Sequence, residues 1–268
     1  MTRYVKSAEE IRALLRLHAE PAFLGRRGLA IQFETDPAFV RAVLPPPLVP
    51  AERPLASVGI SSFRASNCVG PFDGGAITVR CRYGEGGGIE GQYCITMPMS
   101  TDTAVIYGRE LYAEPKKLAA VTLEREGNRA RATVTRHGVA YIELDAELSE
   151  PVPDGDSEVN NFYFKYTIAA DGSGLDHDPL LVCVRSESTI RNAVRGSGTI
   201  RFAASPHDPV ADIPIVRVLG AVWSEGDTFT HGRTLGSVPA DQFLPYAFAK
   251  MDDLTCVAAS AEALAPIG

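Results

Sequence analysis

An alternation of apolar and polar residues with a period of two runs through much of this chain and constrains its fold more than any other feature. The clearest example is Ala130–Arg136, in which alanine and valine alternate with arginine and threonine. Successive side chains of a strand point to opposite faces of a sheet, so this pattern gives a strand one buried face and one polar face. Such strands are typical of antiparallel sheets and barrels.

Candidate strands recur along the chain between clusters of turn residues. We predict strands at Leu29–Phe33, Ala56–Phe63, Ala76–Tyr83, Tyr93–Met99, Ala119–Arg125, Ala130–Arg136, Val139–Leu148, Phe162–Ala169, Leu180–Ser186, Thr199–Ala203 and Ile213–Trp223. Helices do not alternate with these strands as they do in parallel α/β folds. The pattern therefore predicts a mainly β (α+β) fold, organised as a single domain over residues 1–268.

A few helices are expected at the periphery. Ser7 and Glu10 form a capping-box pattern that starts a helix ending near Pro21. Asp36, followed directly by a proline, starts a second helix, which a run of three prolines ends. A short third helix is expected over Asp241–Lys250.

The charge balance excludes several classes of partner. The chain has 33 acidic and 26 basic residues, a net charge of −7 and no basic run. This composition argues against nucleic acid or an anionic membrane as a partner. The sequence has neither the long apolar stretch of a transmembrane helix nor the apolar core of a signal peptide at its N-terminus. We therefore expect a cytoplasmic protein.

The cysteines do not form a metal-binding or disulfide pattern. There are five, no two of them have CxxC spacing, and the odd number argues against a disulfide framework. They are Cys68, Cys81, Cys94, Cys183 and Cys256. Buried free thiols in a reducing compartment are the expected outcome.

Three further patterns do not indicate a phosphate-binding, metal-binding or hydrolase site. Gly84–Gly88 lacks the lysine of a phosphate-binding loop and is expected to be a hairpin turn. Asp176–Asp178 and the pair His207 and Asp208 lie beside prolines, and we expect solvated turns rather than metal ligands there. No Gly-x-Ser-x-Gly elbow supports a hydrolase serine. We therefore expect neither a metal nor a cofactor.

The most informative segment is Tyr107–Leu118, in which Lys116 and Lys117 follow Pro115. An isolated lysine pair is most often solvated, but here the proline fixes the backbone and apolar segments flank the pair. A free lysine has a pKa of about 10.4, whereas attack on a carbonyl needs the neutral amine. Burial disfavours ammonium. Because adjacent strand residues point to opposite faces, we expect desolvation, more than repulsion from Lys117, to neutralise Lys116.

These residues resemble a known family. Gly108-Arg109-Glu110, followed by Pro115-Lys116-Lys117-Leu118, resembles the signature of the acetoacetate decarboxylase superfamily. The stretch from Arg26 to Asp36 more loosely resembles the family's arginine, first strand and first helix. The resemblance implies an antiparallel β-barrel or cone with an additional antiparallel sheet and a few peripheral helices, assembled into homo-oligomers.

The resemblance also implies site residues. Lys116 forms the Schiff base, Lys117 is its neighbour, and Arg26 is the pocket arginine, with Arg27 as the alternative if the alignment shifts by one. The family's decarboxylases carry two acids before the lysine motif, whereas this chain has only Asp73 between residues 54 and 84. Asp73 aligns with the second acid and Gly59 with the first. A less acidic pocket suits a substrate that keeps its carboxylate.

The chemistry implied is attack of Lys116 on a small keto acid to give an iminium, which accepts electrons from a breaking bond at the neighbouring carbon. Decarboxylation of acetoacetate or another β-keto acid is the favoured reaction. An aldolase–dehydratase that condenses pyruvate with an aldehyde uses the same electron sink. Asp73, Tyr112 and Tyr246 are candidate proton donors. A non-catalytic ligand-binding barrel is the remaining alternative, and it predicts an ordinary lysine at position 116.

Overall fold

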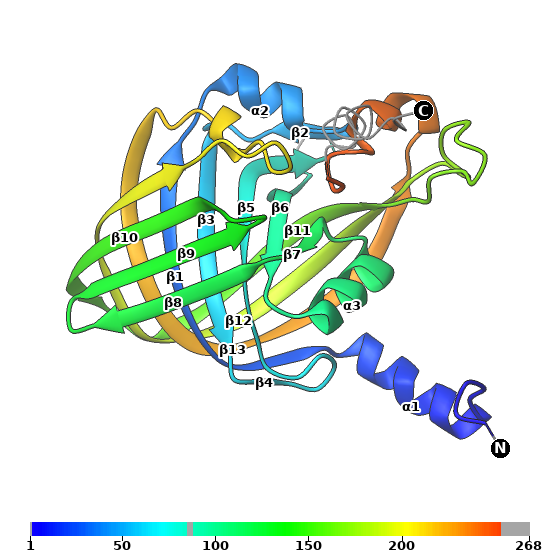
Figure 1. The fold of residues 1–268 in the computed structure, drawn as a ribbon, viewed down its shortest axis with the longest axis horizontal. Helices are drawn as coiled ribbons and strands as arrows, with labels where there is room; N and C mark the ends of the chain where they lie inside the picture. The colour runs from blue at the N-terminus through cyan, green and yellow to red at the C-terminus, as the bar shows by residue number, and fades with distance from the viewer. Residues whose placement is uncertain (1, 85–87, 253–268) are drawn as a thin grey trace, which may run out of the picture.

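The computed structural model describes residues 2–84 and 88–252, which form one large sheet with few helices (Figure 1). The strands are β1 (Ala22–Glu34), β2 (Leu48–Pro50), β3 (Leu55–Phe63), β4 (Ala65–Ser66), β5 (Phe72–Tyr83), β6 (Ile89–Met99), β7 (Lys116–Leu118), β8 (Ala120–Glu126), β9 (Arg129–Arg136), β10 (Val139–Val152), β11 (Gly155–Lys165), β12 (Leu180–Phe202) and β13 (Arg217–Ser237). The helices are α1 (Ala8–Ala19), α2 (Pro37–Val43), α3 (Asp102–Tyr112) and α4 (Ala240–Phe243), with 3₁₀ turns η1 (Val210–Asp212) and η2 (Leu244–Tyr246).

The sheet closes on itself through part of its length. Neighbouring strands pair in the order β11-β6-β5-β3-β1-β13-β12, and β11 also pairs with β12, which returns the path to its start. Every pairing in this ring is antiparallel except that of β11 with β6. The predicted mainly β (α+β) class is therefore confirmed.

The additional sheet is continuous with this ring. The first half of β12 pairs with β11 over Leu180–Ile190, and its second half pairs with β10 over Ala193–Phe202. Strands β9 and β8 then follow β10, and in Figure 1 these three strands cross in front of β1 and β3. The two separate strands predicted at Leu180–Ser186 and Thr199–Ala203 are thus the two halves of β12. An irregularity between Arg191 and Val194 separates the halves.

The core lies between the ring and the additional sheet. Phe33 of β1, Tyr141 of β10 and Phe162 of β11 are fully buried there. The inward residues of β9, such as Ala132 and Val134, are buried as their alternation predicts. Burial of one face per strand holds the register, because a slip by one residue would expose that face.

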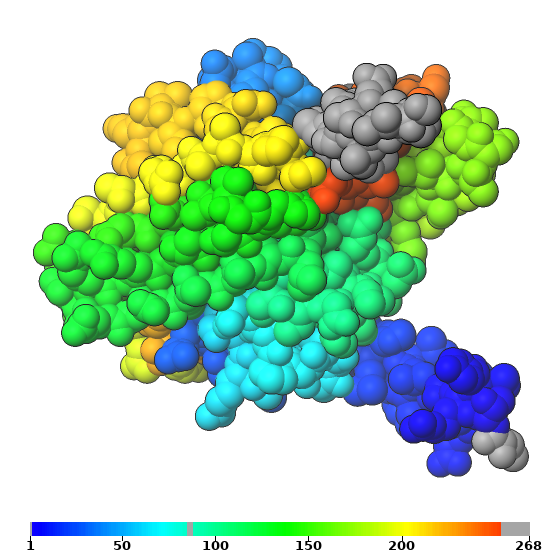
Figure 2. Space-filling model, viewed as in Figure 1, coloured from blue at the N-terminus to red at the C-terminus, as the bar shows by residue number. Residues whose placement is uncertain are grey.

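The helices agree with their start signals. Ser7 Oγ accepts a hydrogen bond from the Glu10 amide at 3.2 Å, and the Ser7 amide donates one to the Glu10 carboxylate, so α1 begins with the predicted capping box. Asp36 caps α2. The segment expected to be helical at Asp241–Lys250 contains α4 and η2. No residue of α1 is buried, and the helix projects from the body of the molecule (Figure 2).

Helix α3 is the main element that the sequence did not predict. Thr101 caps it by accepting a hydrogen bond from the Ala104 amide. No element is predicted at its residues, and in the structure it packs against β7, β6 and β11. None of the described helices is long and apolar enough to span a bilayer.

Candidate active site

Lys116 and Lys117 begin β7, a short strand that pairs in parallel with the edge of β6, where Met97 lies opposite Lys116. Helix α3 ends at Ala113, whose left-handed backbone (φ 59°) turns the chain toward β7. Both lysines are buried, at 7% exposure each. Their amines bind different partners, as expected for adjacent residues of a strand.

The Lys116 amine forms a buried ion pair with Glu114. Lys116 Nζ lies 2.8 Å from Glu114 Oε2, and the two side chains are 8% and 12% exposed. Pro115 stands between them, and the Lys116 amide donates a hydrogen bond to the Glu114 carbonyl oxygen at 2.7 Å. The sequence predicts apolar surroundings for the Lys116 amine, whereas the structure places the Glu114 carboxylate beside it. Sequence analysis missed Glu114, although its position two residues before Lys116, across a proline, was a usable signal.

The Gly-Arg-Glu segment explains how this pair fits. A Cβ atom at Gly108 would lie 2.5 Å from Lys116 Nζ and closer still to Glu114 Oε2. Arg109 donates hydrogen bonds from NH1 to the carbonyl oxygens of Lys116 and Lys250, at 3.1 and 3.0 Å. The glycine therefore leaves room for the ion pair, and the arginine holds the backbone that carries the lysine.

Buried neutral groups surround the ion pair. Cys94 of β6 and Tyr163 of β11 belong to one buried cluster with Tyr112 of α3. Burial, followed by the negative charge of Glu114, raises the pKa of both Cys94 and Tyr163. Because these groups stay protonated in the ordinary pH range, Glu114 is the anion that faces Lys116 among them.

Two buried tyrosine hydroxyls near the pair have no well-formed hydrogen bond among the described residues. The hydroxyls of Tyr107 and Tyr112, both on α3, are buried and make no well-formed hydrogen bond within the described part of the chain. Burial raises the pKa of both, and the charge of Glu114 adds a smaller contribution. Tyr112, a predicted proton-donor candidate, therefore lies near Glu114, the partner of Lys116.

Lys117 belongs to a separate ionic network. Its amine donates to Asp208 Oδ1 at 3.0 Å and to the His207 carbonyl oxygen at 2.9 Å, and it lies 3.5 Å from Asp252 Oδ1. Arg136 binds both acids, at 2.9 Å from Asp208 and 2.7 Å from Asp252. With Asp208 only 2% exposed, this network joins β7 and β9 to the segments at residues 208 and 252.

A cluster of possible metal ligands adjoins this network. One ligand atom each from His137, His207 and Asp252 lies within 4.8 Å of the others. Both carboxylate oxygens of Asp252 already contact the Arg136 guanidinium, so this acid is already paired with a cation. Asp176–Asp178, the other candidate, is exposed in a turn.

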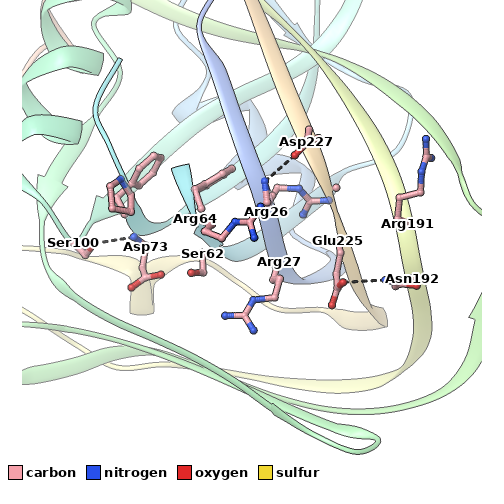
Figure 3. Close-up of a pocket in the computed structure, with 15 residues that line it drawn as sticks. Arg26, Arg27, Ser62, Arg64, Asp73, Ser100, Arg191, Asn192, Glu225 and Asp227 are labelled. Carbon is pink, nitrogen blue, oxygen red and sulfur yellow. Dashed lines mark hydrogen bonds between the residues drawn. The ribbon is translucent and has the colours of Figure 1, made fainter. Parts of the chain in front are cut away.

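Arg26 and Asp73 line a cavity of about 910 Å³, shown in Figure 3. Arg27 and Arg64 also line it, so both alternatives for the pocket arginine face the same space. Arg26 donates to Ser224 Oγ at 2.9 Å, and burial lowers its pKa. No carboxylate pairs with it among residues 2–84 and 88–252, which leaves a desolvated cation free to bind an anion.

The structure therefore divides the predicted site residues into groups. Neither lysine is among the described residues that line the large cavity. Tyr246, another proton-donor candidate, lines a smaller cavity with Cys94 and Lys250. Gly59 lies in the sheet against Ala30, so no acid occupies the first acidic position.

The cysteines and the glycine-rich turn agree with expectation where they are described. Cys68, Cys81, Cys94 and Cys183 are free, and all but Cys68 are buried, whereas Cys256 lies outside the described residues. Tyr83 pairs with Ile89 across the connection between β5 and β6, so Gly84–Gly88 joins a hairpin, although residues 85–87 lie outside the description.

Comparison with known proteins places this geometry in a family. The family model described as acetoacetate decarboxylase matches residues 10–238. The chain belongs to the acetoacetate decarboxylase family. Among curated relatives, it is 25% identical over 254 residues to the CLA biosynthesis isomerase of Lactiplantibacillus plantarum, covering 88% of each chain. It is 29% identical over 218 residues to the acetoacetate decarboxylase of Chromobacterium violaceum, covering 74% of this chain and 81% of that one.

Solved structures share the fold. The acetoacetate decarboxylase of Legionella pneumophila superposes with a TM-score of 0.72 at 20% identity, over 81% of this chain and 87% of that one. The enduracididine biosynthesis enzyme MppR, complexed with the condensation product of pyruvate and imidazole 4-carboxaldehyde, gives a TM-score of 0.70 at 17% identity, over 81% and 89%. The acetoacetate decarboxylase-like fold implied by the lysine motif is thus confirmed.

Proposed function

We propose that this protein is a lyase that forms a Schiff base between Lys116 and a small keto acid and then decarboxylates it. The observation that carries the proposal is the Lys116 amine, 8% exposed and held in a buried ion pair at the motif that resembles the family's reactive lysine. Membership of a family that contains decarboxylases supports it.

In the proposed reaction, the neutral amine adds to the ketone carbon and water leaves, giving a protonated imine. The carbon–carbon bond to the carboxylate then breaks, carbon dioxide departs, and the bonding electrons move to the iminium nitrogen to form an enamine. A proton returns to carbon, and water releases the ketone and the amine. The cationic imine stabilises the developing negative charge, as a positioned charge does in many active sites.

The large cavity supports an anionic substrate or product. Arg26, with no acid paired to it in the described residues, faces this space together with Arg27 and Arg64. Arginine is suited to binding carboxylates through two parallel hydrogen bonds. Asp73, the one acid of the predicted pair that this chain carries, lines this cavity together with Glu225 and Asp227, so the expectation of a less acidic pocket is not met.

A second candidate function is an aldolase–dehydratase that condenses pyruvate with an aldehyde through the same imine. The solved complex of MppR with a condensation product of pyruvate supports this candidate, since MppR shares the fold. One relative is named as a CLA biosynthesis isomerase, so activities other than those of lyases occur among the relatives of this chain. A non-catalytic binding protein remains the alternative if no imine forms.

Borohydride trapping tests the lysine chemistry. Acetoacetate or pyruvate is incubated with the protein, sodium borohydride is added, and the adduct mass is located by peptide mapping. We expect the adduct on Lys116 and its loss in Lys116→Arg, with the exposed-site control Lys165→Arg unchanged. Release of carbon dioxide from acetoacetate, or a condensation product from pyruvate and an aldehyde, distinguishes the two reactions. A folded protein that traps neither acid would contradict both.

We also propose that the protein is cytoplasmic and acts as a homo-oligomer without nucleic-acid or membrane partners. The net charge of −7 supports the absence of polyanionic partners. The half-exposed apolar residues Ile11 and Leu15 on the projecting helix α1 support contact with another copy. Light scattering coupled to size-exclusion chromatography measures the assembly directly.

A further inference from the structure

The carboxylate of Glu114 is placed to exchange a proton with Lys116. The 2.8 Å separation of Oε2 from Nζ is a hydrogen-bonding distance, and the amine donates to the carboxylate. Both groups are largely removed from water, with 12% and 8% exposure, so the carboxylate is the nearest base to the amine. Lys116 is also the only cation recorded in an ion pair with Glu114 among the described residues.

We propose that Glu114 is a catalytic residue that takes the proton from the Lys116 ammonium and later delivers a proton to the enamine carbon. This inference rests on the proposed function, because it assigns the acid and base of the same lysine. Glu114 also supplies an acid in place of the one that is missing when the chain is aligned with the family's decarboxylases. Gly59 occupies one of the two acidic positions, and Asp73, at the other, lines a cavity whose described lining does not include Lys116.

The proton balance closes on the two residues, the water that leaves and re-enters, and one proton taken from solvent in each turnover. Transfer from ammonium to carboxylate gives a neutral amine and a neutral acid. The amine attacks the ketone carbon, and Glu114 returns its proton to the new alkoxide. The carbinolamine nitrogen still carries a proton, which Glu114 accepts and passes to the departing hydroxyl, so that water leaves. After carbon dioxide departs, one proton from solvent recharges Glu114, which then protonates the enamine carbon. Water adds to the resulting iminium, and release of the ketone returns Lys116 to the ammonium form beside the Glu114 carboxylate.

The groups around the carboxylate favour this assignment over a relay through another acid. The titratable groups near Glu114 are Lys116 of β7, Cys94 of β6, Tyr163 of β11, Tyr107 and Tyr112 of α3, and Cys68 between β4 and β5. Burial raises the pKa of these thiol and phenol groups, so they stay protonated near neutral pH. Among these described neighbours, only Glu114 offers a base to the lysine.

Gly108 allows the amine and the carboxylate to pack against α3. Gly108 presents no side chain to either group, and a Cβ atom there would collide with both. The amine and the carboxylate therefore occupy the space that a side chain at position 108 would fill, directly against the backbone of α3. Because a neutral acid and a neutral amine lose the attraction that holds the ion pair, transfer of the proton also frees Nζ to meet a carbonyl carbon.

The test compares the wild type, Glu114→Gln and the exposed-site control Glu124→Gln. Initial rates of borohydride-trapped adduct formation with acetoacetate, and steady-state carbon dioxide release, are measured from pH 5 to pH 10. General acid–base catalysis contributes about 10²- to 10⁴-fold, so we expect kcat of Glu114→Gln to fall by at least about 100-fold with little change in KM. We also expect the remaining rate to rise steadily with pH as solvent deprotonates the lysine, whereas the control keeps the wild-type profile.

Chemical rescue separates catalysis from a structural role. Formate added to Glu114→Ala is expected to restore adduct formation in a concentration-dependent way, because it supplies a carboxylate in the vacated space. Near-UV circular dichroism checks that the variants are folded. A wild-type rate and pH profile in Glu114→Gln would overturn the inference while leaving the lysine chemistry intact. No adduct in the wild type would instead overturn the proposed function, and this inference with it.

Discussion

One nitrogen of Arg109 bridges two distant parts of the chain. NH1 donates to the carbonyl oxygen of Lys116 at 3.1 Å and to that of Lys250 at 3.0 Å. Lys116 begins β7, whereas Lys250 follows η2 near the end of the described residues. The arginine therefore fixes the backbone of the candidate nucleophile to a segment more than a hundred residues away.

Replacing Arg109 should weaken this connection. Arg109→Lys removes the planar guanidinium that reaches both carbonyl oxygens, and hydrogen bonds from charged donors contribute about 1.5–3 kcal/mol each. We expect the free energy of unfolding in urea to fall by about 1–3 kcal/mol, and borohydride trapping at Lys116 to slow. The same substitution at exposed Arg12 on α1 serves as the control and should leave both quantities unchanged.

Adding a methyl group at Gly108 tests the fit of the ion pair. Alanine favours a helix over glycine by about 1 kcal/mol, but overpacking costs about 1–3 kcal/mol. The new Cβ atom would lie 2.5 Å from Lys116 Nζ, so we expect the clash to exceed the helix gain. Gly108→Ala should lower both the stability and the trapping rate. Gly155→Ala, which meets nothing within 4 Å, is the matched control; equal stabilities for the two variants would contradict the packing account.

The Lys117 network should matter for stability. Asp208→Asn leaves Lys117 and Arg136 with only Asp252 as a shared carboxylate. Removing one partner from a buried ionic network typically costs about 3–5 kcal/mol. Asp145→Asn, which breaks exposed pairs with Arg131 on the additional sheet, should cost less than about 1 kcal/mol. Guanidinium unfolding curves of both variants would distinguish these costs.

Acid should weaken the same network through Asp252. Hydrogen bonding to Arg136, the largest cause, lowers the pKa of Asp252 from its ordinary 3.8 to about 2. A carboxyl whose pKa is depressed in the folded protein adds stability that is present above its unfolded pKa and lost as the pH falls toward the folded value. We expect this contribution to disappear between about pH 4 and pH 2. Thermal unfolding across that range should show a smaller acid loss in Asp252→Asn than in the wild type.

The sequence predicts much of the sheet but not its continuity. The alternation in β9 and β10 sets which faces are buried, because a strand carries that information locally. The two halves of β12 read as separate strands because polar residues and glycines lie between them. They are joined in the structure by pairing with β11, β10 and β13, partners far away in the chain. Helix α3 was missed for a related reason, since its packing partners β7 and β11 lie outside its own sequence.

By itself, the sequence determined the strand-rich class, the capped helices α1 and α2, and the lysine motif with its family resemblance, since all of these follow from residue type and local spacing. Only the tertiary structure decided the charges around the two lysines. It buried the local pair of Lys116 and Glu114, joined Lys117 to Asp208 from 91 residues away, and gathered Arg26 and Asp73 at a cavity that neither lysine lines. Whether a buried charge meets a partner depends on which distant strands and turns pack together, and residue spacing along the chain does not encode that distance.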